Sequence, residues 1–490
     1  MLAGIGPAVA WSSQSLPAAT GRKEVERWSI FELSFQGPAA GNPFLEVRFT
    51  GEFRRENRTV PVDGFYDGDG VYRLRFMPDD LGDWTYTTKS NVPELHGHSG
   101  AFVCVPPAKD NHGPVMVRDP HHLCYADGSA YVSFGTTCYA WAHQKESLEE
   151  LTLQTLRSSP FNKIRMCILP TEAHPQRFPF ERKASGENDL SRFDVTFFQH
   201  FERRIQDLCN LGIEADLILF HPYDKLGYGN MPPDVNRRYL RYVVARFSAF
   251  RNVWWSIANE YDLVKTKTMP EWDEFFRIIQ ESDPYGHLRS VHYSRVFYDY
   301  SKPWVTHLSL QSDDFARTQE WLAQYKKPII FDECKYEGNI NRRWGNLSGQ
   351  EMTRRFWIGM VSGAYVGHGE TYPNQAGTAW TSQGGLLVGE SPKRIAFLKK
   401  IFAEAPALDL NAPADPYYPV ISKPGEYYLY FFDYHQPIDY EFNLPQETSF
   451  QADLIDPWEM TIAPFPGSYK GKCTLKLPGR PYLAVRFRKI

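Results

Sequence analysis

The stretch Asn252-Val-Trp-Trp-Ser-Ile-Ala-Asn-Glu-Tyr-Asp262 is an apolar run that ends in an amide followed directly by an acid. β-Branched and aromatic residues dominate positions 253–258 without polar alternation, which is typical of a buried parallel strand. Asn259 and Glu260 would then lie at the C-terminal end of that strand. This is the end at which α/β barrels keep their reactive residues.

A second segment repeats this design. Lys327-Pro-Ile-Ile-Phe-Asp-Glu-Cys334 is apolar through Phe331 and then ends in Asp332 and Glu333. Two carboxylates at the tips of two strands of one barrel can face each other across a pocket, which is the arrangement that cleavage of a glycosidic bond requires. The sequence therefore directs attention to Glu260 and Glu333 as a pair.

Length and composition limit the classes of protein to consider. A chain of 490 residues is too long for one compact core and indicates two or three domains. Its net charge of -4 gives no reason to expect nucleic acid or an anionic membrane as a partner. No run approaches the roughly 20 apolar residues of a membrane span. Aromatic residues make up 15% of the chain, and tryptophan and tyrosine are the side chains that stack on the apolar faces of sugar rings.

The sequence lacks the signatures of cofactor and metal chemistry. The seven cysteines show neither a disulfide framework nor metal-ligand spacing, so we expect buried thiols. There is no Walker loop, no His-Glu-x-x-His, no Gly-x-Gly-x-x-Gly between strand and helix, and no nucleophile elbow. We expect no cofactor and no metal. Residues 1–21 lack the basic start of a signal peptide, which predicts a loose tail and a cytoplasmic protein, with secretion as the alternative.

Changes in hydrophobic rhythm divide the chain. Short alternating strands fill residues 22–107 and 411–490, which predicts two β-sandwich domains. Between them, residues 108–410 show eight successive repeats of a strand followed by a helix, near the length that a barrel needs. The predicted fold class is α/β, a (β/α)8 TIM barrel flanked by an N-terminal and a C-terminal β-sandwich.

The chemistry of acetal hydrolysis assigns roles to the pair. One carboxyl must deliver a proton to the leaving oxygen, and a carboxylate must capture the developing cation. We assign Glu260 as acid/base and Glu333 as nucleophile, with Asn259 binding a sugar hydroxyl. If both acids lie at strand ends of a narrow barrel, their carboxyls would be about 5 to 5.5 Å apart, which predicts retention of configuration.

The two acidic strands also carry a family resemblance. Ser256-Ile-Ala-Asn-Glu260 and Ile329-Ile-Phe-Asp-Glu333 resemble the strand-four and strand-seven signatures of the clan A retaining glycoside hydrolases. The whole layout is similar to the group of glycosidases with an N-terminal β-sandwich, an apiosidase-like or cellulase-like barrel and a C-terminal β domain. The resemblance implies a sugar substrate and places the acid/base on Glu260 and the nucleophile on Glu333.

Other positions that the clan occupies with particular residues are matched only in part by this sequence. Arg165 fits the strand-two arginine of the clan, and His221 fits the histidine after strand three. The tyrosine that steadies the nucleophile from strand six has no match here, and Tyr293 on strand five could substitute for it. Five more side chains would face the catalytic end if the predicted strands are right, and each is about as consistent with packing as with sugar contact: Trp141, His143, Gln311, Glu370 and Trp380.

The preferred interpretation is a retaining, exo-acting β-glycosidase on a pyranoside or furanoside. Loops at 171–192 and 222–234 would rise over the catalytic face and could close a pocket, and Glu370 could bind two hydroxyls there. The alternatives are an inverting or endo-acting glycosidase and a non-catalytic carbohydrate-binding barrel. The expected partner is a carbohydrate, and a homo-oligomer is left open.

Overall fold

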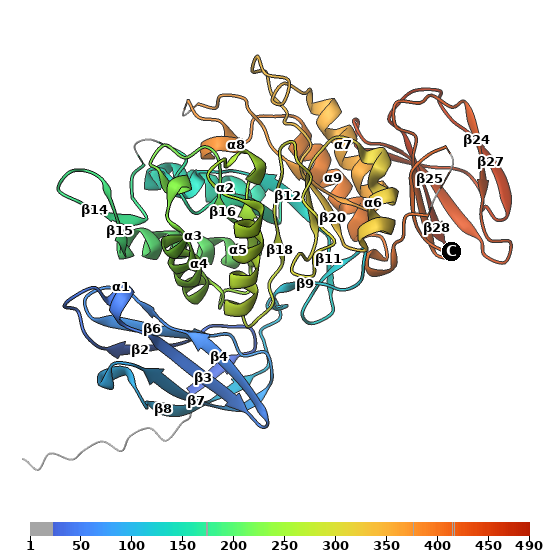
Figure 1. Ribbon diagram of the computed structural model, residues 1–490. Coiled ribbons are helices and arrows are strands. Elements are labelled where there is room, and N and C mark those ends of the chain that lie inside the picture. The colour runs from blue at the N-terminus through green and yellow to red at the C-terminus, as the bar shows by residue number, and fades with distance from the viewer. Residues whose placement is uncertain (1–22, 173–174, 376, 414, 416) are drawn as a thin grey trace, which may run out of the picture.

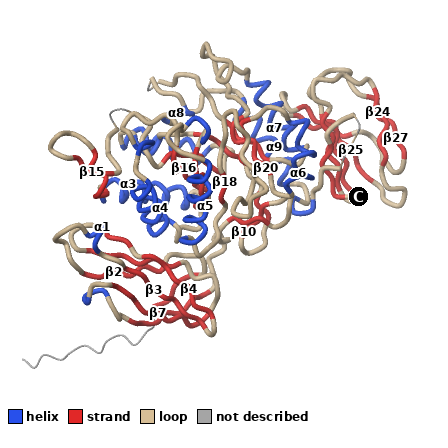
Figure 2. Tube along the Cα trace, in the orientation of Figure 1, coloured by secondary structure: helices blue, strands red, loops and turns tan. Residues whose placement is uncertain are grey.

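The computed structural model describes residues 23–172, 175–375, 377–413, 415 and 417–490. The predicted tail at residues 1–21 lies outside them. The chain forms a central barrel with one β domain below it and another beside it (Figure 1). Coloured by secondary structure, the helices gather in the middle part and the two outer parts consist mainly of strands (Figure 2). Among the described residues, no helix is long and apolar enough to cross a membrane.

The N-terminal domain is a sandwich of two sheets. A five-stranded sheet has the order β1-β8-β7-β3-β4, and a three-stranded sheet has the order β2-β6-β5. Alternating apolar residues meet between them, with Phe31, Phe53 and Phe102 buried in one cluster. The strands are β1 (Lys23–Glu26), β2 (Phe31–Gln36), β3 (Phe49–Arg55), β4 (Arg58–Asp63), β5 (Phe65–Tyr66), β6 (Val71–Phe76), β7 (Gly82–Ser90) and β8 (Ser99–Val105).

The middle of the chain is an eight-stranded parallel barrel, which confirms the predicted fold. The strand order is β18-β17-β16-β13-β12-β21-β20-β19, and a parallel bridge between His292 and Ser309 links its two ends. The strands are β12 (Phe134–Thr137), β13 (Lys163–Cys167), β16 (Glu214–Phe220), β17 (Val253–Ala258), β18 (Arg289–Ser290), β19 (Leu308–Gln311), β20 (Ile329–Glu333) and β21 (Tyr365–His368).

Helices cover the outside of the barrel. Asp194 caps α3 by accepting from the backbone of Thr196 and Phe197, and Thr268 with Glu271 forms a capping box at α5. The helices are α2 (Glu146–Ser158), α3 (Val195–Asn210), α4 (Pro233–Phe247), α5 (Met269–Ser282), α6 (Thr318–Tyr325), α7 (Gly349–Val361), the short α8 (Trp380–Gln383) and α9 (Ser391–Ala403).

Two segments differ from the predicted pattern. The loop expected at 171–192 contains a hairpin of β14 (Phe180–Arg182) and β15 (Asn188–Phe193). The helix predicted at residues 193–211 therefore begins later, as α3 at Val195, and Phe193 ends a strand. The first barrel strand, predicted at residues 131–136, is β12 and begins at Phe134. Tyr131 instead belongs to β11 (Ala130–Tyr131), in a small antiparallel sheet with β10 (Leu123–Tyr125) and β9 (Val115–Val117).

The C-terminal domain packs a five-stranded sheet on a two-stranded one. The orders are β22-β23-β28-β25-β26 and β24-β27. Its joint with the barrel includes Arg486 Nη1, which lies 2.6 Å from Glu404 Oε2. The strands are β22 (Val420–Lys423), β23 (Tyr427–Phe431), β24 (Asp439–Asn443), β25 (Phe450–Asp456), β26 (Thr461–Pro464), β27 (Lys472–Lys476) and β28 (Ala484–Lys489).

Buried ion pairs join the N-terminal domain to the barrel helices. Asp67, in the turn between β5 and β6, lies 2.7 Å from Arg246 of α4. Arg75 of β6 lies 2.7 Å from Glu202 of α3. Because these charges are largely desolvated, removing one partner would leave the other uncompensated. The aspartate of this turn is therefore a structural contact between domains.

Candidate active site

A pocket of about 820 Å³ opens at the C-terminal ends of the barrel strands. Its volume is within the range of small-molecule sites. Segments that follow all eight strands line it, so side chains surround it on every side. The lining residues are Tyr139, Thr171, Tyr223, Lys225, Glu260, Ser294, Gln311, Ser312, Asp313, Glu333, Cys334, Lys335, Tyr336, Ile340, Trp344, Thr371, Ala379, Thr381 and Ser382.

A β-bulge turns Glu333 into this pocket. Asp332 points into the barrel, where its carboxylate accepts from Lys163 Nζ at 2.6 Å and from Ser309 Oγ at 2.6 Å. Strict alternation would then direct Glu333 outward. However, the register pairs Ser309 with Ile330 and Gln311 with Glu333, so β20 carries one extra residue. Such a bulge re-aims the side chain that follows it, which brings Glu333 to the pocket wall.

Glu260 reaches the pocket by a different backbone device. It follows β17 with a φ of 43°, in the left-handed region. For a residue other than glycine this conformation costs roughly 1 kcal/mol or more, and such residues cluster at functional sites. The turn lets Asn259 and Glu260 both face the ends of neighbouring strands, although they are consecutive in the chain.

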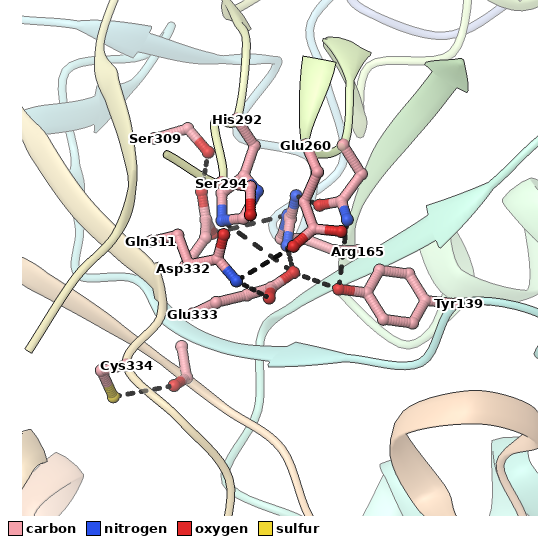
Figure 3. Close-up of polar contacts among 12 residues, drawn as sticks. Tyr139, Arg165, Glu260, His292, Ser294, Ser309, Gln311, Asp332, Glu333 and Cys334 are labelled. Carbon is pink, nitrogen blue, oxygen red and sulfur yellow. Dashed lines mark hydrogen bonds and ion pairs between the residues drawn. The ribbon is translucent and has the colours of Figure 1, made fainter. Parts of the chain in front are cut away.

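Arg165 and Tyr139 hold one oxygen of Glu333 (Figure 3). Arg165 Nη1 donates to Glu333 Oε1 at 3.0 Å, and its Nη2 donates to Asn259 Oδ1 at 2.7 Å. The hydroxyl of Tyr139 donates to the same Oε1 of Glu333. The arginine is 1% exposed, so its charge acts on the carboxylate with little screening by water.

The amide of Gln311 connects the two carboxylates. Its Nε2 lies 3.2 Å from Glu260 Oε1 and 3.4 Å from Glu333 Oε2. The distance between Glu260 Oε1 and Glu333 Oε2 is therefore no larger than the sum of these two distances. On the other side, Tyr223 donates to Glu260 Oε2 at 2.5 Å and accepts from Asn259 Nδ2 at 2.9 Å.

The surroundings of Glu333 act on its pKa in opposite directions. Burial raises the pKa of Glu333, and the neighbouring charge of Glu260 adds to the rise. The guanidinium of Arg165 and the hydrogen bond from Tyr139 lower this pKa, and the net result is a value above the ordinary 4.5. Two carboxyls that share one pocket disfavour double ionisation, so a proton is readily held between them.

Three predicted contacts lie beneath the pocket and do not line it. Trp141 is fully buried in the barrel core. His143 contacts the carbonyl of Cys167 through Nε2 at 2.8 Å, and His221 contacts the carbonyl of Leu169 at 2.9 Å. Burial lowers the pKa of both histidines. The expected sugar contacts from these side chains are therefore corrected to packing roles, since the turn after each strand points them inward.

Trp380 and Glu370 are also placed differently from the prediction. Trp380 is fully buried and donates from Nε1 to Thr136 Oγ1 at 2.8 Å. Glu370 accepts from the backbone N–H groups of Val388 and Gly389 at 2.7 and 2.9 Å. Neither side chain lines the pocket, so neither the stacking platform nor the hydroxyl-binding acid proposed for them is present.

Glu370 belongs to a sealed cluster that could be mistaken for a metal centre. Ligand atoms of Glu337, His368 and Glu370 lie within 4.8 Å of one another. However, Glu337 accepts from the backbone N–H groups of Glu390 and Ser391 at 2.7 and 3.1 Å, at the start of α9. The carboxylate of Glu337 thus holds the N-terminus of α9, a position that favours negative charge.

The tyrosines of the site were the main omission from the predicted set. Tyr293, expected to steady the nucleophile, packs its ring on Phe297 at 5.0 Å between centroids. Tyr139, in the segment after β12, donates to Glu333 instead, and Tyr336 lies 3.3 Å from the Tyr139 hydroxyl. Their positions directly after strands one and seven were the available signal.

Comparisons with known proteins agree with this geometry. The model of the apiosidase-like catalytic domain matches residues 118–406, more than half of the chain. Two domain families of unknown function match on either side, DUF5060 at residues 24–91 and DUF5605 at residues 417–488. No curated protein shows a significant match to the chain.

Solved structures give the same result. A crystal structure of a proposed glycoside hydrolase from Bacteroides vulgatus ATCC 8482 is 39% identical, with a TM-score of 0.91 over 96% of this chain and 100% of that one. A glycoside hydrolase family 5 structure from the same organism is 14% identical, with a TM-score of 0.60 over 77% of this chain and 94% of that one, and it supports the fold alone. The chain therefore belongs to the apiosidase-like family and is a glycoside hydrolase.

Proposed function

We propose that the enzyme is an exo-acting, retaining β-glycosidase with Glu333 as nucleophile and Glu260 as acid/base. The observation that carries the proposal is the contact of one amide, Gln311 Nε2, with both carboxylates. This contact limits the distance between Glu260 Oε1 and Glu333 Oε2 to the lower edge of the roughly 6.5 to 9.5 Å between the carboxyls of inverting enzymes. It accommodates the roughly 5 to 5.5 Å of retaining enzymes. The substrate is a β-linked pyranoside or furanoside.

The uneven distribution of donors supports this division of roles. Arg165 and Tyr139 both donate to Glu333, and the ion pair at 3.0 Å favours its ionised form. Glu260 receives neutral donors only, the hydroxyl of Tyr223 and the amide of Gln311. The charged donor at Glu333 suits a carboxylate that attacks as an anion, and Glu260 is the partner that we propose as proton donor.

The reaction then follows in two displacements. Glu333 attacks the anomeric carbon as Glu260 gives its proton to the departing oxygen, which yields a glycosyl ester on Glu333 and a free alcohol. Water next attacks the anomeric carbon, Glu260 removes the water proton, and the ester bond to Glu333 breaks. Asn259, whose amide accepts from Arg165 at 2.7 Å and donates to Tyr223 at 2.9 Å, is the residue that we propose binds the hydroxyl beside the reacting carbon.

The shape of the pocket supports exo action. Residues after all eight strands contribute to its wall, and the segment that follows β20 and the one that follows β21 add the most. A wall on every side accepts the end of a sugar chain, whereas an endo-acting enzyme needs a cleft open at two opposite edges. Removal of terminal sugars is the activity that fits such a pocket.

A screen of nitrophenyl glycosides tests the proposal. Wild type and Glu333→Gln would be compared on α- and β-linked pyranosides and furanosides, with the anomer of the first product followed by NMR. We expect a β-glycoside to be hydrolysed by wild type alone, with the β anomer formed first. Equal rates in the variant would remove Glu333 from the mechanism, and an initial α anomer would establish inversion.

A further inference from the structure

The outer part of the pocket has one apolar aromatic surface that the two-carboxylate mechanism does not use. Trp344, in the segment between β20 and α7, lines the pocket and is 50% exposed. Its indole N–H has no hydrogen-bond partner within the described part of the chain. An indole left half in water carries apolar area whose burial by a ligand would be favourable.

The backbone holds this exposed side chain in place. Tyr336 donates its backbone N–H to the carbonyl of Trp344 at 2.7 Å, and Thr371 Oγ1 donates to the carbonyl of the next residue, Gly345, at 2.6 Å. A Cβ added to Gly345 would lie 2.8 Å from Thr371 Cγ2, so the segment packs closely against the loop after β21. Exposure of the indole is therefore not a sign of a loose loop.

Aromatic contacts connect the indole to the reaction centre. The rings of Trp344 and Tyr336 meet edge to face, with centroids 6.0 Å apart. The Tyr336 hydroxyl lies 3.3 Å from that of Tyr139, which donates to Glu333. Trp344 thus lies one ring beyond the tyrosines around Glu333.

The other aromatic residues in the pocket lining are tyrosines whose hydroxyls make hydrogen bonds within the site. Tyr139 and Tyr223 use their hydroxyls on the carboxylates, and Tyr336 uses its hydroxyl on Tyr139. The remaining rim is largely polar, with Lys335 paired to Asp313. Trp344 is therefore the lining aromatic whose ring is available for stacking.

We propose that Trp344 is the binding platform for a second sugar of the substrate, on the leaving-group side of the cleaved bond. This rests on the proposed function. The C–H groups on one face of a sugar ring form a flat apolar surface that an indole can cover, while its hydroxyls stay in the polar rim. The natural substrate is accordingly an oligosaccharide or polysaccharide end, and not a glycoside with a small aglycone.

The test uses two donors of the sugar that the nitrophenyl screen identifies. One is the glycosyl fluoride, whose leaving group cannot stack, and the other is an oligosaccharide that ends in the same sugar. We expect Trp344→Ala to lower kcat/KM on the oligosaccharide about 10- to 100-fold, mainly through KM, and on the fluoride less than about threefold. Trp344→Phe should restore most of the loss, and Leu45→Ala, an exposed apolar residue of the N-terminal domain, should change neither rate.

Each other outcome has a defined meaning. Equal losses on both donors, or no loss on the oligosaccharide, would overturn the platform. Glu333→Gln should abolish both rates, so persistence of its activity would overturn the proposed function without involving Trp344. Calorimetric titration of Glu333→Gln and Glu333→Gln/Trp344→Ala with the oligosaccharide gives a readout without turnover. We expect at least about tenfold weaker binding in the double variant, and equal affinity or no binding to either protein would overturn the proposal.

Discussion

The barrel holds two pairs of buried glutamates that differ in what surrounds them. Glu260 and Glu333 receive hydrogen bonds from side chains and line the pocket. Glu337 and Glu370 receive hydrogen bonds mainly from the backbone of residues 388–391, with the Ser391 hydroxyl as a further donor to Glu337, and both are fully buried. The first pair lines the pocket in which we propose that the reaction takes place, whereas the second pair is enclosed by the chain.

The two pairs of glutamates are the same residue type and differ in whether a ligand can reach them. A Cβ added to Gly389 would lie 2.5 Å from Glu370 Oε2 and 2.6 Å from Glu337 Oε2, so the space between those carboxylates is closed by the chain itself. The pocket beside Glu260 and Glu333 admits a ligand. Side-chain donors such as Tyr139 and Gln311 can also turn as a proton moves, whereas backbone donors at the start of α9 are fixed by the helix.

The largest expected effect is the loss of the nucleophile. Glu333→Gln should lower kcat by roughly 10⁴-fold or more, because the glycosyl ester can no longer form, with little change in unfolding free energy. The matched control is Glu370→Gln, which should keep kcat within a few-fold and lower stability instead. Kinetics on the best nitrophenyl substrate and urea unfolding measure the two effects. The opposite distribution would show that the two pairs have exchanged roles.

The loss of the acid should depend on the leaving group. Glu260→Gln removes the proton donor, so hydrolysis of a sugar or alkyl glycoside should fall by about 10² to 10⁴-fold. A dinitrophenyl glycoside leaves as a stable anion without a proton, so its first step should be far less affected. The ratio of the two rates, measured in wild type and variant, checks the assignment. A uniform loss on both substrates would place Glu260 outside acid catalysis.

A smaller effect should appear in the pH profile. The hydrogen bond from Tyr139 lowers the pKa of Glu333, so Tyr139→Phe should raise that pKa further. The nucleophile would then stay protonated to higher pH, and the acidic limb of kcat/KM should move upward, with a loss of about tenfold near pH 5. Tyr293→Phe is the matched control, because the Tyr293 ring packs on Phe297, and its limb should not move. A shift in Tyr293→Phe alone would reverse the correction made from the structure.

The barrel could be predicted because its signals are local. The segment 253–258 was expected as a strand from its apolar run and is β17, and the eight repeats of strand and helix are present. The hairpin of β14 and β15 was not predicted, since its residues 188–192 are only half-buried and carry little alternation. Hydrophobic periodicity in a sequence reflects burial of one face of an element. A hairpin that projects from the barrel buries few residues, so its sequence shows little periodicity.

The site was predictable at the level of strand ends and not beyond them. Glu260 and Glu333 follow runs that any buried strand would show, and Arg165 and Gln311 alternate with core residues. The outward or inward direction of a residue after the last strand position depends on bulges and left-handed turns, such as those at Glu333 and Glu260. Trp141 and Trp380 were misplaced because they lie in a short turn and a short helix beyond the strand ends, where strand alternation no longer sets the direction of a side chain. Tyr139 was missed because its position after strand one does not by itself distinguish a donor to a carboxylate from a packed ring.

The smallest expected effect concerns the sealed pair and is one of stability against pH. Burial raises the pKa of Glu370 to about 7. A carboxyl whose pKa is higher folded than unfolded binds its proton more tightly in the native state, so its contribution is complete below about pH 4.5 and is lost as the pH rises through about 7. The total is on the order of 3 kcal/mol.

Glu370→Gln resembles the protonated carboxyl and cannot ionise. The difference in unfolding free energy between wild type and variant should therefore favour wild type most at low pH and shrink as the pH rises from 5 to 8. Urea unfolding at several pH values in that range measures it. A difference that stays constant with pH would mean that Glu370 does not titrate there, and that the backbone N–H groups of Val388 and Gly389 compensate its charge.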